Sequence, residues 1–313
     1  MADATASRLG QANASGSTQA LFLTVFGQLV LNSFLQANIM MPLVTVRTIP
    51  HGKTAQFPAI HTTSAAYHTV GAEVVGTAIK HNERTILVDD ALIASAFVSN
   101  LDELKNHYDV RADYAKKLGH ALALYTDIRQ LRIAVLAARA SATISGGSSG
   151  TQLTNADYDT NGETLADGIF DAAQTLDEKN VPDTDNRYCV IKPAQYNLLA
   201  QTTKVLNKDW NGSGSYSDGR IYKIANVTIL KSNNLPQANV ASGETGENNT
   251  YSGDFSNTMG VVFTPDAVGT VKLRDLNVEA QWDFRRRGTL MIAELICGHG
   301  ILRPECSVEL KVA

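Results

Sequence analysis

Apolar side chains recur at helical spacing along the middle of the chain. From Asp109 to about Ala140 the sequence contains no proline, and its apolar residues form one continuous stripe. Asp109 suits the N-cap position, because its carboxylate can accept hydrogen bonds from the first free amides of a helix. At 1.5 Å per residue the predicted helix is roughly 45–50 Å long, which is typical of a rigid beam. The stripe consists of Tyr114, Leu118, Ala121, Leu122, Tyr125, Ile128, Leu131 and Val135.

A second helical pattern lies near the start of the chain. It follows nineteen residues rich in Ala, Ser, Gln and Gly, which we expect to be mobile until a partner orders them. The broad apolar face of this helix either docks on a neighbouring molecule or packs on its own domain, and the pattern does not favour one over the other. That face consists of Phe22, Phe26, Leu29, Val30, Phe34 and Ala37.

Between residues 44 and 93 the pattern changes to short alternating stretches around a long polar interval. Residues 44–49 and part of 85–89 alternate as strands do. More than thirty residues dense in Thr, Ala, Gly and His separate them, which exceeds what a compact turn needs. An extended two-stranded ribbon reconciles these features. Because an isolated ribbon is only marginally stable in water, we expect a neighbouring molecule on which it lies.

The pattern from about Thr151 to Thr264 predicts an α/β lobe, and further strands follow it. Apolar residues 165, 169, 170, 173 and 176 mark one helix, and Pro193 suits the start of the next. Gly146–Gly150 is expected to form a flexible loop before the lobe. Two polar loops, 207–219 and 237–257, are expected to project from it. The predicted strands are 188–191, 227–230, 261–263, 268–273, 290–297 and 307–312.

Composition and charge limit the possible classes of function. The chain has 313 residues, of which 44% are apolar and 19% charged, as in an ordinary globular protein of one elaborated domain or two lobes. Lys and Arg total 27 against 31 Asp and Glu, a formal net charge of -4. A protein that grips duplex DNA needs a basic face to neutralise phosphates. If DNA is a partner, we expect it to be enclosed and not grasped.

The cysteines and the hydropathy pattern indicate a cytoplasmic origin. Cys189, Cys297 and Cys306 are too few and too scattered for a disulfide framework or a zinc site. Residues 20–44 are the only candidate for a membrane or targeting segment, but polar residues interrupt them and no basic leader precedes them. We therefore expect no association with a membrane.

No arrangement of residues predicts catalysis, metal binding or a cofactor. The seven histidines form no HExxH pair, no GxSxG elbow occurs, and the glycines at 146–150 are not followed by the Lys-Ser/Thr of a phosphate loop. We therefore predict no catalytic residue, no metal ligand and no cofactor-binding residue.

Three conspicuous motifs have a plainer explanation. His299, which lies between two glycines, is expected in a tight turn. Asp89 and Asp90 are expected to be solvated, since adjacent residues of a strand point to opposite faces and do not form a metal pair. The basic run Arg285–Arg287 could contact DNA or an acidic neighbour, but a solvated turn is the interpretation that we prefer.

Six stretches of the sequence, taken in order, carry a resemblance to a known family. They are ALFLTVFG at 20–27, VRTIPHGKTAQFP at 46–58, AAY at 65–67, NHYDVRADYAKKLG at 106–119, AVGTVKLRDL at 267–276 and GHGILRPE at 298–305. In these stretches the chain resembles the major capsid proteins of T-seven-like short-tailed phages, the autographivirus group, which adopt the Hong Kong 97-type capsid fold. The resemblance spans nearly the whole chain, but residues 141–162 and the two loops of the lobe match poorly.

The resemblance implies an α+β fold of the Hong Kong 97 type in five segments. The function that it implies is structural and not enzymatic: self-assembly into hexamers and pentamers of an icosahedral T = 7 shell. A scaffolding protein and a portal protein would take part in forming a procapsid, and the shell would enclose phage double-stranded DNA without specific binding. The implied location is the virion capsid, assembled in the host bacterial cytoplasm. The segments are an N-terminal arm (1–46), an E-loop (47–92), a P domain with the spine helix (93–150), an A domain (151–265) and the C-terminal strands of the P domain (266–313).

In that fold the E-loop lies across an adjacent subunit, which makes its cations candidates for contacts between subunits. Lys53, Lys80 and Arg84 are these cations, and they could pair with Asp109 or Asp113 on the neighbouring spine helix. The alternative is that all of them are merely solvated, because exposed ion pairs contribute only about 0–1 kcal/mol.

Two other functions compete with a phage capsid. One is the shell of a bacterial nanocompartment, similar to an encapsulin, which shares the fold but encloses an enzyme. The other is a cytosolic α/β enzyme, for which we expect a ligand pocket lined by groups of perturbed pKa.

Overall fold

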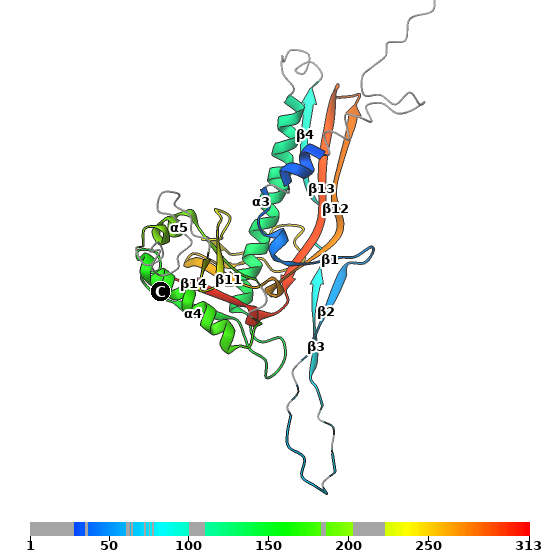
Figure 1. Cartoon of the computed structure of the whole chain (residues 1–313). Helices are drawn as coiled ribbons and strands as arrows, with labels where there is room; N and C mark the ends of the chain where they lie inside the picture. Colours follow the sequence, from blue (N-terminus) through cyan, green and yellow to red (C-terminus); the bar gives the residue numbers. More distant parts are fainter. Residues whose placement is uncertain are drawn as a thin grey trace, which may run out of the picture. The chain divides into compact units, whose positions relative to one another are not determined.

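A computed structural model describes most of the chain (Figure 1). Its residues fall into two compact units. The units lie within Met1–Ile39, Asp90–Thr126 and Arg274–Ile296, and within Met40–Asp89, Asp127–Leu273 and Cys297–Ala313. For residues 110–112 the structure describes the backbone alone. The described residues are 28–34, 37–60, 63, 65–71, 73–74, 76, 78–99, 110–182, 186–202 and 223–313.

The long helix α3, Val110–Arg139, confirms the predicted helix of 30 residues or so. Its predicted N-cap, Asp109, lies outside the described residues. The prediction of a one-sided apolar stripe is wrong for the C-terminal half, where most residues from Thr126 to Ala138 are buried on all sides. Hydrogen bonds to several of the polar groups there reduce the cost of this burial. The buried carboxylate of Asp127, for example, accepts a hydrogen bond from the amide of Met40 at 3.1 Å.

In the first unit, the described part of the N-terminal helix packs on its own subunit. Residues 28–34 are helical, and Val30 and Phe34 are buried. Gly119 of α3 permits a close approach, since a Cβ at this position would lie 2.3 Å from the carbonyl oxygen of Val30. Of the two expected roles, packing on its own domain is therefore confirmed for residues 28–34. Phe22 and Phe26 lie outside the described residues.

Long strands complete the first unit and continue into the second. Strand β4 (Leu92–Ser99) pairs antiparallel with β13 (Gly288–Ile301), and β13 neighbours β12 (Val268–Asp283). Both β12 and β13 are longer than the predicted strands. The parallel neighbour of β12 is β1 (Thr45–Thr48), so the strand predicted at residues 44–49 exists but belongs to this four-stranded sheet.

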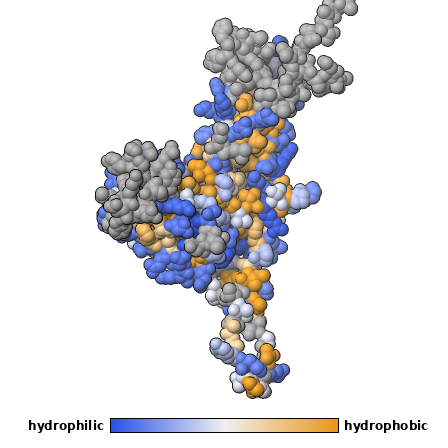
Figure 2. All heavy atoms as spheres, in the orientation of Figure 1, coloured by the Kyte–Doolittle hydropathy of each residue, from blue (hydrophilic) through white to orange (hydrophobic). Residues whose placement is uncertain are grey.

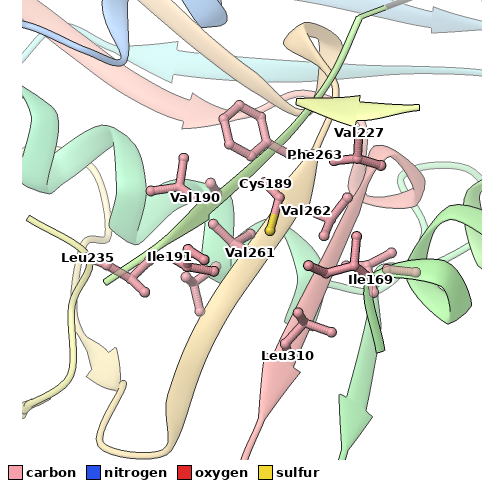
Figure 3. Packing of buried hydrophobic residues seen from close by; sticks show 14 of the residues in the cluster. Ile169, Cys189, Val190, Ile191, Val227, Leu235, Val261, Val262, Phe263 and Leu310 are labelled. Carbon is pink, nitrogen blue, oxygen red and sulfur yellow. The ribbon is translucent and has the colours of Figure 1, made fainter. Parts of the chain in front are cut away.

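The second unit contains a mixed six-stranded sheet of order β5-β14-β11-β6-β8-β7. All six residues of β11 are buried, and they pack with residues of β6, β14 and α4 in the core shown in Figure 3. The helix and strands predicted for the lobe are confirmed, except that Phe170 of α4 is exposed. The elements are β5 (Thr151–Thr154), α4 (Gly162–Glu178), β6 (Arg187–Ile191), α5 (Pro193–Ala200), β7 (Lys223–Ile224), β8 (Val227–Lys231), β11 (Thr258–Phe263) and β14 (Ser307–Lys311).

The loops of the second unit differ from their predictions in one respect. The glycine loop 146–150 is held at its end, because the amide of Gly150 donates to the carbonyl of Ala140 at 3.0 Å and a Cβ on Gly150 would lie 2.3 Å from the carbonyl oxygen of Ala137. This glycine is therefore needed for a close approach and not for flexibility. Of the two polar loops, 207–219 lies outside the described residues. The other contains β9 (Asn239–Val240) and β10 (Gly253–Asp254).

Candidate assembly surface

A two-stranded hairpin in the second unit matches the predicted ribbon. Strand β2 (Thr54–Ile60) pairs antiparallel with β3 (His81–Leu87), from Thr54 opposite Leu87 to Ile60 opposite His81 (Figure 1). The first strand of the ribbon is therefore 54–60 and not 44–49, because the latter residues pair with β12. Pro58 has no amide hydrogen to donate, which suits a strand with an open edge. No third strand joins this sheet in the part of the chain that the structure describes.

The far end of the hairpin exposes large apolar side chains. Tyr67, Val70 and Val74 keep 106%, 96% and 79% of their reference accessible area, and Ile60 keeps 63%. Figure 2 shows hydrophobic residues among the polar ones along this end of the hairpin. A two-stranded sheet that leaves such side chains in water gains little from its own burial. The described residues at the end of the hairpin, 63–79, thus form an apolar tip that is available to a partner.

The root of the hairpin is packed tightly against the glycines that flank His299. Ile86 is almost fully buried, and a Cβ on Gly300 would lie 2.8 Å from its side chain. A Cβ on Gly298 would lie 1.9 Å from the carbonyl oxygen of Leu87. The prediction of a tight turn at His299 is therefore wrong: this residue lies within β13, and its glycine neighbours make room for β3.

A cluster of hydrogen-bonded polar side chains surrounds Asp89, at the root of the hairpin. The carboxylate of Asp89 accepts hydrogen bonds from the backbone amide of Asn248 at 2.8 Å, from the side chain of Asn249 at 3.0 Å and from the hydroxyl of Tyr251. Burial raises the pKa of Asp89, although these hydrogen bonds oppose the rise. Burial, together with the charge of Asp89, also raises the pKa of Tyr251. The expectation that Asp89 is solvated is therefore wrong, whereas Asp90 is exposed as predicted.

His299 is wholly enclosed in the same region. Its Nδ1 lies 2.9 Å from the hydroxyl of Thr270, which also accepts a hydrogen bond from Gln130 at 3.0 Å. The other ring nitrogen, Nε2, lies 3.5 Å from the sulfur of Cys297. Burial, with a smaller contribution from the charge of Arg129, lowers the pKa of His299 to about 3. The ring is neutral at physiological pH.

The cations predicted to contact a neighbouring subunit have the following surroundings. Lys53 is exposed in the turn before β2, and Asp113 is exposed on α3. Lys80 donates to the carbonyl of Ser145 at 3.2 Å, and Nε of Arg84 donates to the hydroxyl of Thr143 at 3.1 Å. These two contacts within the chain join residues about sixty positions apart, and no local pattern in the sequence indicates them.

The basic run Arg285–Arg287 forms the turn between β12 and β13. All three residues are exposed, as predicted for a solvated turn. The carboxylate of Asp283 accepts the amides of Arg285 at 2.9 Å and Arg286 at 3.2 Å, which shapes the turn. Phe284 at its tip is exposed as well.

The described residues contain no metal site, no disulfide and no membrane-spanning helix. In its described part, no three His, Cys, Asp or Glu side chains converge in a way that could hold a metal ion. The three cysteines are buried and form no disulfide. No helix among the described residues is both long enough and apolar enough to cross a bilayer.

Comparison with known proteins shows the family. The model of the family described as "Gp10A-like: Major capsid protein" matches residues 56–311. The major capsid protein of Escherichia phage T7 is 29% identical over 320 residues, which cover 94% of this chain and 92% of the relative. The capsid structure of the Cyanophage P-SCSP1u is 40% identical with a TM-score of 0.82, and the match covers 100% of this chain and 99% of that one.

A more distant structure shows the same fold. The mature capsid of bacteriophage PhiM1 matches with a TM-score of 0.75 at 18% identity, over 88% of this chain and 87% of that one. The predicted α+β capsid fold is thereby confirmed. Both alternatives are therefore wrong: the chain is neither a cytosolic enzyme nor a nanocompartment shell protein, but a viral capsid protein. The chain belongs to the Gp10A-like family of major capsid proteins, and its function is to build the shell of a phage capsid.

Proposed function

We propose that copies of this chain form hexamers and pentamers of a T = 7 procapsid, with a scaffolding protein and with a portal protein at one vertex. Assembly takes place in the host bacterial cytoplasm, and the finished shell encloses double-stranded DNA without binding a particular sequence. The net charge of -4 supports this last point, because the chain has no basic excess with which to grip phosphates. The five segments 1–46, 47–92, 93–150, 151–265 and 266–313 are the parts that we assign to arm, E-loop, P domain, A domain and returning P-domain strands.

The observation that carries the proposal is the exposed apolar tip of the β2–β3 hairpin. We infer that this hairpin is the E-loop and that its tip lies on a neighbouring copy, where Tyr67, Val70 and Val74 lose contact with water. Contacts of this kind, from one patch to a different patch on the next copy, propagate around a ring and close a shell. Each contact can be weak, because a millimolar affinity corresponds to only about 4 kcal/mol. Many such contacts together make the shell persistent.

Replacing Tyr67, Val70 and Val74 by Ser is expected to leave the subunit folded and to reduce the yield of closed shells by roughly tenfold or more. Burying one large apolar side chain contributes about 1.5–3 kcal/mol, and about 1.4 kcal/mol corresponds to a tenfold change in affinity. Shells are counted by electron microscopy after co-expression with the scaffolding protein, and folding is checked by thermal unfolding.

The matched control replaces the same three residues by Phe, Ile and Ile, which keeps the tip apolar. Shells should then form at the normal yield. If the Ser variant assembles as well as its control, the tip does not bind a neighbouring copy and the proposal fails.

We further propose that Lys53, Lys80 and Arg84 face the acidic residues Asp109 and Asp113 of the adjacent subunit's spine helix. Reversing the charge of Lys53 and Arg84 together should impair assembly of a folded subunit. Because Arg84 also contacts Thr143 in its own chain, a charge exchange is the sharper test. Lys53→Glu should lower shell yield several-fold, and adding Asp113→Lys should restore it. Normal yield from Lys53→Glu alone, or no recovery in the exchange, would remove the pairing.

A further inference from the structure

The side chain of Asn249 completes the hairpin at its root as a strand neighbour would. Its Oδ1 accepts the amide of Leu87 at 3.1 Å, and its Nδ2 donates to the carbonyl of Leu87 at 2.7 Å. This is the pair of hydrogen bonds that one residue of an antiparallel strand exchanges with its partner. Leu87 is the last residue of β3, and the amide of the next residue, Val88, still donates to the carbonyl of Lys53 at 2.8 Å.

The two residues after Leu87 are held by the same loop. Nδ2 of Asn248 donates to the carbonyl of Val88 at 2.8 Å, and the Asp89 carboxylate accepts the backbone amides of Asn248 at 2.8 Å and of Asn249 at 3.3 Å. Three consecutive residues of the hairpin root, 87–89, are thus fixed by residues 248–251. We call residues 248, 249 and 251 with Asp89 the asparagine clasp.

The loop that carries the clasp is itself anchored to the long helix. Arg129 of α3 lies 2.6 Å from the carboxylate of Glu247 and 3.3 Å from that of Glu244. Its guanidinium also lies over the ring of Tyr251, 5.7 Å from the centroid. These contacts connect the hairpin root, through the clasp, to the C-terminal half of α3. The clasp therefore has contacts both with the hairpin root and with the buried guanidinium of Arg129.

Because the clasp lies at the root of the hairpin, a small rotation there produces a larger displacement of the tip. A strand of seven residues such as β3 is about 23 Å long, so a rotation of about 10° at its root moves its far end by about 4 Å. Two apolar side chains remain in contact only within about 4–4.5 Å. A small rotation of the hairpin at residues 87–89 would therefore displace the tip from its binding site on another molecule.

We infer that Asn248, Asn249 and Asp89 are positioning residues for assembly, which fix the direction in which the hairpin leaves its subunit. The inference rests on the proposed function, in which the tip binds a neighbouring copy. Contacts of Asn82 and Arg84 with Thr143 lie further along β3 and are made by side chains of the hairpin. The clasp differs from them because it binds the backbone at the pivot of the hairpin.

Asn249→Asp tests the inference, because it keeps the size of the side chain but turns its donor toward Leu87 and Asp89 into an acceptor. Spin labels on Thr69→Cys at the tip and Asp167→Cys on α4 report the direction of the hairpin in the soluble, unassembled full-length chain. Both positions are exposed, and the native cysteines are buried, so labelling is selective. We expect the distance distribution to broaden and the shell yield with the scaffolding protein to fall about tenfold.

The matched control is Thr245→Ala, an exposed position in the same loop, which should change neither readout. If Asn249→Asp fails to fold, Asn248→Ala, which removes only the contact with Val88, is measured in the same way. An unchanged distance distribution overturns the inference, whatever the yield. A broadened distribution with normal yield shows that hairpin direction does not govern assembly and overturns the positioning role. Whether the tip binds a neighbour at all is decided separately by the Ser variant of the tip.

Discussion

Replacing Arg139 by Gln is expected to lower the free energy of unfolding by about 3–5 kcal/mol. Arg139 binds Glu309 through two hydrogen bonds, from Nε at 2.7 Å and from Nη2 at 2.6 Å. Glu309 lies on β14 and is wholly buried, and it also accepts a hydrogen bond from the hydroxyl of Thr258 at 2.6 Å. Without the guanidinium, a buried carboxylate would lose its compensating charge.

The pKa of Arg139 is consistent with the dependence of buried Glu309 on the charge of the guanidinium. Its hydrogen bonds with Glu309 raise the pKa of the guanidinium, so Arg139 is charged throughout the physiological range. Arg139 also donates to the carbonyl of Asp254 at 2.5 Å, and its guanidinium lies over the ring of Phe255. The loss of these contacts adds to the cost of the substitution.

The double variant Arg139→Gln, Glu309→Gln is the control, and urea unfolding of the unassembled subunit is the measurement. Two neutral amides can still bond to each other, so the double variant should recover a large part of the loss. A single variant that loses less than about 1 kcal/mol would contradict the prediction, because that is the value of an exposed ion pair.

Acidification is expected to destabilise the subunit through His299, by about 1.4 kcal/mol per pH unit between about pH 6.5 and pH 3. The folded pKa of about 3 lies below the unfolded value of 6.5, so the unfolded chain takes up a proton in this range while the folded chain does not. The contribution of His299 to stability is therefore complete above pH 6.5 and is lost as the pH falls toward 3. Acidification has the opposite effect through Asp89. The pKa of Asp89 is raised in the folded chain, so protonation favours the folded state.

Urea unfolding at pH 7, 6, 5 and 4 of the natural chain and of His299→Gln isolates this effect. Gln can accept a hydrogen bond from Thr270 but does not titrate, so the variant should be less stable at pH 7 and less sensitive to acid. The difference between the two chains should shrink by about 1.4 kcal/mol per unit. Parallel curves would mean that protonation of His299 does not govern the response.

Local sequence patterns predicted the elements that carry either periodic apolar residues or a helix start signal. The long helix and α4 were predicted from their apolar residues at helical spacing, and the start of α5 was predicted from Pro193. The first strand of the hairpin was missed because Thr54–Ile60 contains a proline and polar residues and has little to bury. The full length of β12 was missed for a related reason: from Arg274 onward its residues are mostly exposed or half-buried.

The polar residues at the root of the hairpin were mispredicted because their partners are distant in sequence. Tyr251 follows Asp89 by 162 positions, and the hydroxyl that binds Nδ1 of His299 belongs to Thr270, 29 positions earlier. Rules that consider only neighbouring residues identify the adjacent carboxylates of Asp89 and Asp90 and a histidine, His299, between two glycines. The pair Asn248-Asn249 looks like any polar loop, and nothing local marks it as the partner of Leu87.

The place of β14 in the six-stranded sheet has a consequence for the order of folding during synthesis. This strand lies between β5 and β11, and its residues 307–311 pair with both. A ribosome makes β5 and β11 long before it makes β14, so the sheet cannot close until the strand has left the exit tunnel. A chain halted before Ser307 would lack Glu309 and would leave two strand edges open. Only subunits translated through this strand can therefore complete the six-stranded sheet.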